Sequence, residues 1–88
     1  MKSIRSLERI FKGVANHWRI EILLAIKKNP DMTLLAISQK LDCNLKTIAE
    51  HTRRLVIAGL VRKRRLDNMT LHHLPPYGEK VVKILQEF

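Results

Sequence analysis

Apolar residues recur at helical spacing in the first half of the chain, and capping residues divide them into separate helices. The first helix is predicted over residues 3–13. Asn16 is a good N-cap for a second helix, and Pro30 lies just past the end of that helix. Thr33 can cap a third helix over residues 34–41. The pattern therefore predicts three short helices in succession.

A fourth helix is predicted over residues 45–58, after the short turn "DCN". Asn44 can accept hydrogen bonds from the first amides of this helix, and Gly59 fits the left-handed position that closes it. One side of the helix is expected to carry Leu45, Ile48, Thr52 and Leu55. The opposite side is expected to carry Lys46, Glu50, Arg53 and Ile57. The helix thus has a mainly apolar back and a mainly polar front.

After the fourth helix the spacing becomes that of two short strands. The segments "LVRKRRL" and "TLHHL" predict a hairpin over residues 61–73, with a turn at "DNM". Pro75 and Pro76 end the hairpin, because proline supplies no amide hydrogen to a ladder. A last helix follows over residues 77–88. The predicted fold is mainly α with a small β-hairpin, in the order α-α-α-α-β-β-α, and residues 1–88 form a single domain.

Two helices joined by a three-residue turn, with a basic hairpin behind them, make a winged helix-turn-helix. A helix that enters the major groove needs an apolar back that holds it on its domain and a polar front that meets base edges. The hairpin, or wing, can lay cations along phosphates or in the minor groove. We therefore expect a recognition helix at residues 45–58 and a basic wing at residues 61–73. The candidate DNA-contacting residues are Lys46, Thr47, Ala49, Glu50, His51, Arg53 and Arg54 in the helix, and Arg62, Lys63, Arg64 and Arg65 in the wing.

The charge of the chain favours a polyanionic partner. Seventeen Lys and Arg against eight Asp and Glu give a net charge of +9, an excess that attracts nucleic acid. Residues 1–30 and residues 44–73 each carry +5, so the charge lies in two blocks. An acidic membrane surface and an incidental solvated surface are the competing interpretations of the charge. Two alternative functions also stay open: a winged-helix protein-interaction module and a sequence-independent DNA-coating protein.

Two segments resemble the ArsR-like repressors of bacteria and archaea. "FKGVANHWRIEILLAI" is similar to the opening of that family, and "LLAISQKLDCNLKTIAEHTRRLVIAGLVRKRR" is similar to its helix-turn-helix and wing. The likeness covers about residues 7–66. It implies a transcriptional regulator that acts as a repressor on an operator. The positions that match directly are Thr47, Ile48, His51, Leu55, Ala58, Gly59, Leu60 and Val61.

The residues with which many members of that family sense metals are absent. Thr33 and Leu35 stand where those members have a Cys-x-Cys pair, and the last helix has no histidine or aspartate. His72 and His73 are adjacent on a predicted strand, so their side chains point to opposite faces and do not readily share an ion. Cys43, in the turn, is expected to be a packed residue, with a redox switch as the alternative. We expect no metal site and no cofactor.

The first and last helices each offer an apolar stripe, and a chain of 88 residues has little interior to receive both. Both stripes could pack onto their own domain. The resemblance instead implies a homodimer paired through these two helices, whose two-fold symmetry would match a palindromic site. The predicted dimer contacts are Ile4, Leu7, Ile10, Phe11, Val14, Val81, Ile84, Leu85 and Phe88.

The chemistry and location expected of the protein follow from what its sequence contains. No nucleophile–base pair, phosphate loop or paired-carboxylate site is visible, so we expect no catalysis. The N-terminus lacks the apolar core of a signal peptide, and the single cysteine fits a reducing compartment. No apolar run approaches the roughly 20 residues of a membrane span. We expect a cytoplasmic, nucleoid-associated protein whose partners are double-stranded DNA and a second copy of itself, with no membrane.

Overall fold

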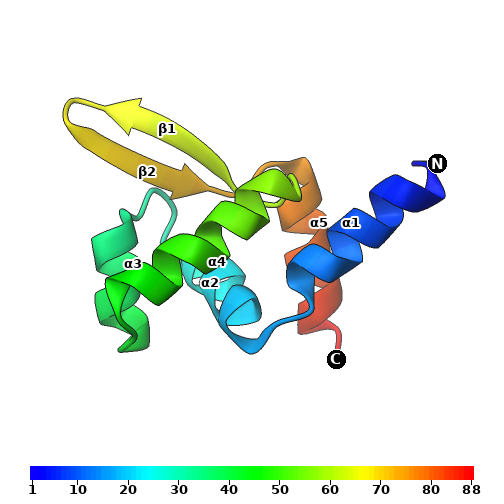
Figure 1. The fold of residues 1–88 in the computed structure, drawn as a ribbon, viewed down its shortest axis with the longest axis horizontal. Coiled ribbons are helices and arrows are strands. Elements are labelled where there is room, and N and C mark those ends of the chain that lie inside the picture. Colours follow the sequence, from blue (N-terminus) through cyan, green and yellow to red (C-terminus); the bar gives the residue numbers. More distant parts are fainter.

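Five helices and one antiparallel hairpin make up the computed structural model, which describes residues 1–88 (Figure 1). The predicted order α-α-α-α-β-β-α is confirmed; the bounds predicted for α3 are the observed ones, and the other predicted bounds lie within two residues of the observed ones. The elements are α1 (Ile4–Val14), α2 (His17–Lys28), α3 (Leu34–Leu41), α4 (Leu45–Ile57), β1 (Arg62–Leu66), β2 (Met69–His73) and α5 (Pro76–Gln86).

The predicted capping residues begin and end the middle helices. The side chain of Asn16 accepts hydrogen bonds from the backbone amides of Trp18 and Arg19, which satisfies the first free donors of α2. Thr33 and Asn44 accept in the same way from amides of α3 and α4. Gly59 follows α4 with a φ of 80°, a left-handed conformation that glycine adopts without strain. The local signals in the sequence are therefore sufficient to place these helices.

The hydrophobic core is centred on α2. Ile22, Leu23 and Ile26 are fully buried there, and Ile37 of α3 and Ile48 of α4 pack into the same cluster. Complete burial of one such side chain contributes about 1.5–3 kcal/mol. The helix-turn-helix pair α3 and α4 is therefore held on α2 by apolar packing.

The hairpin is anchored on one strand only. All five residues of β1 are exposed, whereas β2 is partly buried and lies against the loop between α2 and α3. The amide of His72 donates to the carbonyl of Met32, and the amide of Asp31 donates to the carbonyl of His72. Leu66 pairs with Met69, so the turn has two residues and the expected three-residue turn "DNM" is wrong by one position. The hairpin thus projects from the core with β1 facing solvent (Figure 1).

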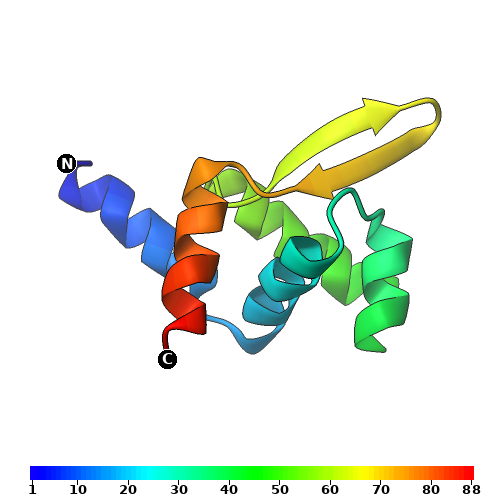
Figure 2. The same ribbon diagram turned by 180° about the vertical axis from the view of Figure 1, so that it is seen from behind.

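Helix α5 returns the chain to the side of α1. It starts at Pro76, in the first position of a helix, where the missing amide hydrogen has no consequence. Gly78 lies so close to the backbone of Leu60 that a Cβ there would collide with the Leu60 carbonyl oxygen. Seen from behind, α5 runs beside α1, at the end of the molecule away from the hairpin (Figure 2). None of the five helices is both long and apolar enough to cross a membrane.

Candidate nucleic-acid interface

The inner side of α4 fixes this helix on the domain. Ile48, Thr52 and Leu55 are at most 2% exposed, as their spacing predicted. The hydroxyl oxygen of Thr52 has no hydrogen-bond partner in this apolar setting. Leu45 was expected on the same side, but it is 47% exposed, so this part of the prediction is wrong. Leu45 occupies the first helical position, where the helix leaves the core.

The outer side of α4 is polar and accessible. Lys46, Glu50 and Arg53 are exposed, while Thr47, Ala49 and His51 are partly buried at its margins. The cap formed by Asn44 leaves Lys46 in the first turn, beside the N-terminus of the helix. This is the arrangement expected of a helix that presents its front to the major groove.

Glu50 pairs with two arginines of the same helix. Its carboxylate accepts from Arg53 Nη2 at 2.8 Å and Nε at 3.2 Å, and from Arg54 Nε at 3.2 Å. The hydrogen bond from Arg53 lowers the pKa of Glu50, and the same bond raises the pKa of Arg53. Sequence reasoning treated these three residues as independent contacts, although their i,i+3 and i,i+4 spacing predicts such pairs. Glu50 therefore orients both arginines of α4 in this structure.

The four basic residues of β1 divide between the two faces of the hairpin. Side chains alternate along a strand, so Lys63 and Arg65 share one face while Arg62 and Arg64 share the other. Arg64 Nη2 lies 3.1 Å from a carboxylate oxygen of Asp31, which compensates its charge. Lys63 has no carboxylate partner. The wing therefore does not present its basic residues as one block.

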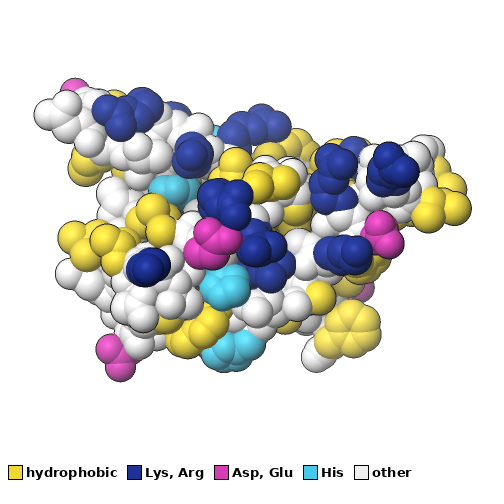
Figure 3. Space-filling view, viewed as in Figure 1, with side chains coloured by type: hydrophobic (Ala, Val, Ile, Leu, Met, Phe, Trp, Pro, Cys, Tyr) yellow, Lys and Arg dark blue, Asp and Glu magenta, His cyan; other side chains and the backbone are white.

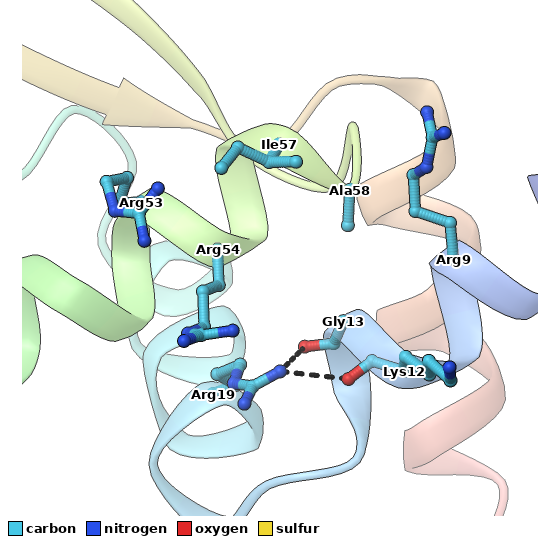
Figure 4. Close-up of a pocket in the computed structure, with 8 residues that line it drawn as sticks. All are labelled: Arg9, Lys12, Gly13, Arg19, Arg53, Arg54, Ile57 and Ala58. Atoms are coloured by element: carbon cyan, nitrogen blue, oxygen red, sulfur yellow. Dashed lines mark hydrogen bonds between the residues drawn. The ribbon is translucent and has the colours of Figure 1, made fainter.

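Helix α1 adds basic residues that the sequence analysis did not place at this surface. Arg9 and Lys12 of α1 and Arg19 of α2 line an open cavity of about 470 Å³ together with Arg53 and Arg54 of α4 (Figure 4). The signal for them was the charge of +5 in residues 1–30. The sequence could not show that α1 and α4 meet.

A close approach of α1 and α4 forms this cavity. A Cβ on Gly13 would lie only 2.6 Å from the Cβ of Ala58, so the two backbones approach as closely as they do because residue 13 is glycine. Arg19 joins the three helices: its Nη1 donates to the carbonyls of Lys12 and Gly13, and its Nε donates to Nδ1 of His51. His51, a candidate DNA-contacting residue, thus accepts a hydrogen bond within the protein.

Many cations are visible on one face of the molecule. Lys and Arg side chains lie over the hairpin, over α4 and over α1 in the same view (Figure 3). Part of each basic block of the sequence therefore lies on one face, whereas Lys27 of the first block pairs with Glu79 of α5. The chemistry of this face suits a ligand that carries many negative charges in a row, such as a nucleic-acid backbone.

Three further residues with chemically active side chains do not line the basic cavity: His72, His73 and Cys43. His72 is 1% exposed, its Nδ1 lies 2.9 Å from the carbonyl of Met32, and its burial lowers its pKa. His73 lies on the opposite face of β2, as expected from the alternation of a strand. Cys43 is half-buried and packs against the core. No three His, Cys, Asp or Glu side chains lie close enough together to hold a metal ion.

The opposite end of the molecule carries an apolar groove between α1 and α5. It has a volume of about 460 Å³. Phe11 and Ile84 are 69% and 47% exposed, and Phe88 is fully exposed. Every residue predicted at the dimer interface lines the groove except Ile4, which is 82% exposed. The groove residues from that prediction are Leu7, Ile10, Phe11, Val14, Val81, Ile84, Leu85 and Phe88.

The solved structures that share this fold include the following three. The homodimeric winged helix-turn-helix DNA-binding domain of Mb0332 from Mycobacterium bovis, a possible ArsR-family transcriptional regulator, has a TM-score of 0.84 at 22% identity, covering 98% of this chain and 85% of that one. A MarR family protein from Bacillus stearothermophilus has a TM-score of 0.79 at 20% identity, covering 94% and 59%. FabT from Streptococcus pneumoniae, solved in complex with DNA, has a TM-score of 0.75 at 22% identity, covering 80% and 51%.

Comparison with protein families gives a more specific result than these structures. No curated protein sequence matches the chain. The sequence model of the winged helix-turn-helix DNA-binding family matches residues 17–62, from the start of α2 to the first residue of β1. Since this match covers more than half of the chain, the protein belongs to the winged helix-turn-helix DNA-binding family.

Proposed function

We propose that the protein is a sequence-specific double-stranded DNA-binding transcriptional regulator that represses by occupying an operator. The observation that carries this proposal is α4: its back is buried in the core while Lys46 and Arg53 stand exposed on its front, with the basic hairpin beside it. A helix held in this way can enter the major groove without reorganising the domain. Bound over a promoter, the protein would exclude the transcription machinery.

The ArsR-like type of regulator is the finer part of this proposal. It is supported by the segments around α2 and α4 that resemble that family, and by the likeness to Mb0332 over nearly the whole chain. The MarR family protein has a similar fold, but the match covers only 59% of that protein's length. Thr33 and Leu35 lack the thiols of a metal-sensing member, so we propose a regulator whose input is not a thiol-bound metal.

The regulator acts as a homodimer in this proposal. The groove between α1 and α5 leaves aromatic and aliphatic side chains exposed, and a second copy of the same groove could cover them. Mb0332 is described as homodimeric, which supports the same arrangement here. A two-fold dimer would present two α4 helices to a palindromic operator. Such a protein would act in the cytoplasm, on the nucleoid.

Selection of bound duplexes from a random DNA pool tests the proposal. The expected result is enrichment of one sequence with two-fold symmetry. Binding without enrichment of any sequence would instead support a DNA-coating protein, since a backbone contact carries no sequence information. Absence of binding at low salt would support a protein-interaction module.

A further inference from the structure

The cavity where α1, α2 and α4 meet has an unusual lining. It contains the cationic side chains of Arg9, Lys12, Arg19, Arg53 and Arg54, and no carboxylate. Its volume of about 470 Å³ falls within the roughly 300–1,000 Å³ of small-ligand sites. Such sites are ordinarily mostly apolar, whereas only Ile57 and Ala58 are apolar here. The lining therefore selects for an anion and against an apolar molecule.

Arg19 is held in place before any ligand arrives. Its Nη1 donates to the carbonyl oxygens of Lys12 at 2.9 Å and of Gly13 at 3.3 Å, and its Nε donates to Nδ1 of His51 at 3.3 Å. The two carbonyls carry no charge, and burial together with the nearby Arg19 and Arg54 lowers the pKa of His51, which favours its neutral form. Nη2 makes no hydrogen bond within the protein, so a fixed, uncompensated cation is available to a ligand.

One of the other cations approaches this fixed group, whereas the side chain of Arg9 extends away from it (Figure 4). The side chain of Arg54 extends toward Arg19 along one side of the cavity, and α1 lies across from them (Figure 4). Arg54 uses only its Nε on Glu50, which leaves both of its terminal nitrogens free. Lys12 has one carboxylate nearby, Glu8, at 3.9 Å and on the exposed surface, where such a pair contributes little.

We propose that this cavity is a phosphate-binding site, with the phosphate group held between Arg19 and Arg54 in a cavity that Arg9 and Lys12 of α1 also line. A phosphate has oxygens on every side and up to two negative charges, which suits donors that come from three different helices. The planar forks of the two arginines match its oxygens better than a lysine would. The phosphate belongs either to the DNA backbone or to a free phosphorylated molecule. The site can be tested without DNA, because inorganic phosphate is sufficient to probe it.

Nuclear magnetic resonance of the full chain, titrated with inorganic phosphate at constant pH and ionic strength, tests the site. We expect saturable shifts of the amides of Gly13 and Ala58 and of the Nε–H of Arg19. Arg54→Gln removes a charge-assisted hydrogen bond and should weaken the apparent affinity by about tenfold or more. Lys28→Gln, which removes one exposed charge at the C-terminal end of α2, outside the cavity, is the matched control and should leave the affinity unchanged. Shifts that do not saturate, or equal weakening by the two variants, would overturn the site.

The same titration with the protein saturated by duplex DNA separates the two sources of phosphate. If the backbone fills the site, duplex abolishes the response to inorganic phosphate. Lys12→Gln then lowers the salt slope of DNA binding by about one unit, because the duplex has one phosphate fewer neutralised. If a free phosphorylated molecule fills it, the response persists in the DNA complex and the slope is unchanged. Both results support the phosphate site. If the chain binds no duplex, the titration without DNA still decides the site, so its failure is distinguishable from failure of the proposed function.

Discussion

At the residue scale, Glu50 determines how α4 presents its positive charge. The carboxylate lies between Arg53 and Arg54 and accepts from both, so it orients the two arginines. Fixing a long side chain in advance reduces the entropy cost of binding a base. Arg53 keeps its other terminal nitrogen free. The pair therefore positions Arg53 without neutralising the whole surface, since Lys46 remains unpaired.

The first prediction separates base contacts from phosphate contacts. Arg53→Ala should weaken binding to the selected duplex far more than to a scrambled one, because removing a bidentate hydrogen bond to a base costs about 1–3 kcal/mol at that position. Lys63→Ala is the matched comparison in the wing and should weaken both duplexes about equally. Arg64 is a poorer choice than Lys63, because Asp31 already compensates its charge. Titration of each variant on both duplexes provides the measurement, and equal weakening on both by Arg53→Ala would contradict base contact.

The second prediction concerns pH and the buried His72. Burial lowers its pKa below the usual value of about 6.5, so the unfolded chain takes up a proton that the folded protein does not. The free energy of unfolding is therefore highest above about pH 6.5 and should fall as the pH drops below that value, by up to about 1.4 kcal/mol per pH unit. His51, whose pKa is also lowered, acts in the same direction.

Urea unfolding at a series of pH values tests this prediction. His72→Gln should flatten the pH dependence between about pH 5 and 6.5, whatever it does to the stability at neutral pH. His17→Gln is the control, because His17 is exposed at the start of α2. An unchanged pH dependence in His72→Gln would assign the effect to other groups.

At the element scale, the packing of α1 on α4 brings parts of the two basic blocks of the sequence together. Gly13 and Ala58 touch across it, and Arg19 ties the C-terminal carbonyls of α1 to α4 through His51. These carbonyls lack partners within α1, so the guanidinium of Arg19 also completes the end of that helix. The cationic face therefore depends on α1, which is not part of the helix-turn-helix.

The third prediction tests that packing. Gly13→Ala should destabilise the protein by about 1–2 kcal/mol, since overpacking against Ala58 outweighs the helix preference of alanine over glycine. The double variant Gly13→Ala with Ala58→Gly should recover part of the stability, because it removes the methyl group in the way. Urea unfolding of both variants is the measurement. Stabilisation by Gly13→Ala alone would mean that the two helices can separate without cost.

The fourth prediction concerns the groove between α1 and α5. Phe11→Glu should convert a dimer into monomers at tens of micromolar, because it places a charge in an apolar interface and leaves the core intact. Leu66→Glu changes an equally apolar, exposed residue of the hairpin and is the control. Deletion of residues 81–88 is less informative, since Val82 is 1% exposed and belongs to the core. Sedimentation is the measurement, and a monomeric parent protein would contradict the dimer.

The elements show which parts of the structure were predictable from the sequence. The caps at Asn16, Thr33 and Asn44 act within a few residues, so the helices could be placed correctly. The burial of His72 could not be predicted, because it depends on a loop 40 residues earlier that runs beside β2. The basic cavity was not predicted for the same reason. A helical pattern shows which residues share a face of α1, but it does not show which other helix that face contacts.

At the scale of the whole molecule, the protein has two surfaces of different chemistry. The hairpin, α4 and the adjoining part of α1 form a cationic face, while α1 and α5 form an apolar groove at the end away from the hairpin (Figures 2 and 3). A polyanion and a second copy of the chain could therefore bind at the same time. Helix α1 contributes to both surfaces, so dimer formation and DNA binding would be coupled through it.

The fifth and central prediction is that the whole cationic face binds duplex DNA. Direct titration of the selected duplex by the unmodified protein, at several salt concentrations, tests it. If a dimer neutralises roughly 6–10 phosphates, its affinity should fall about 10³–10⁵-fold between 50 and 200 mM salt, and a scrambled duplex should bind more weakly at every salt concentration. An affinity that does not change with salt, or is the same for both duplexes, would contradict the account.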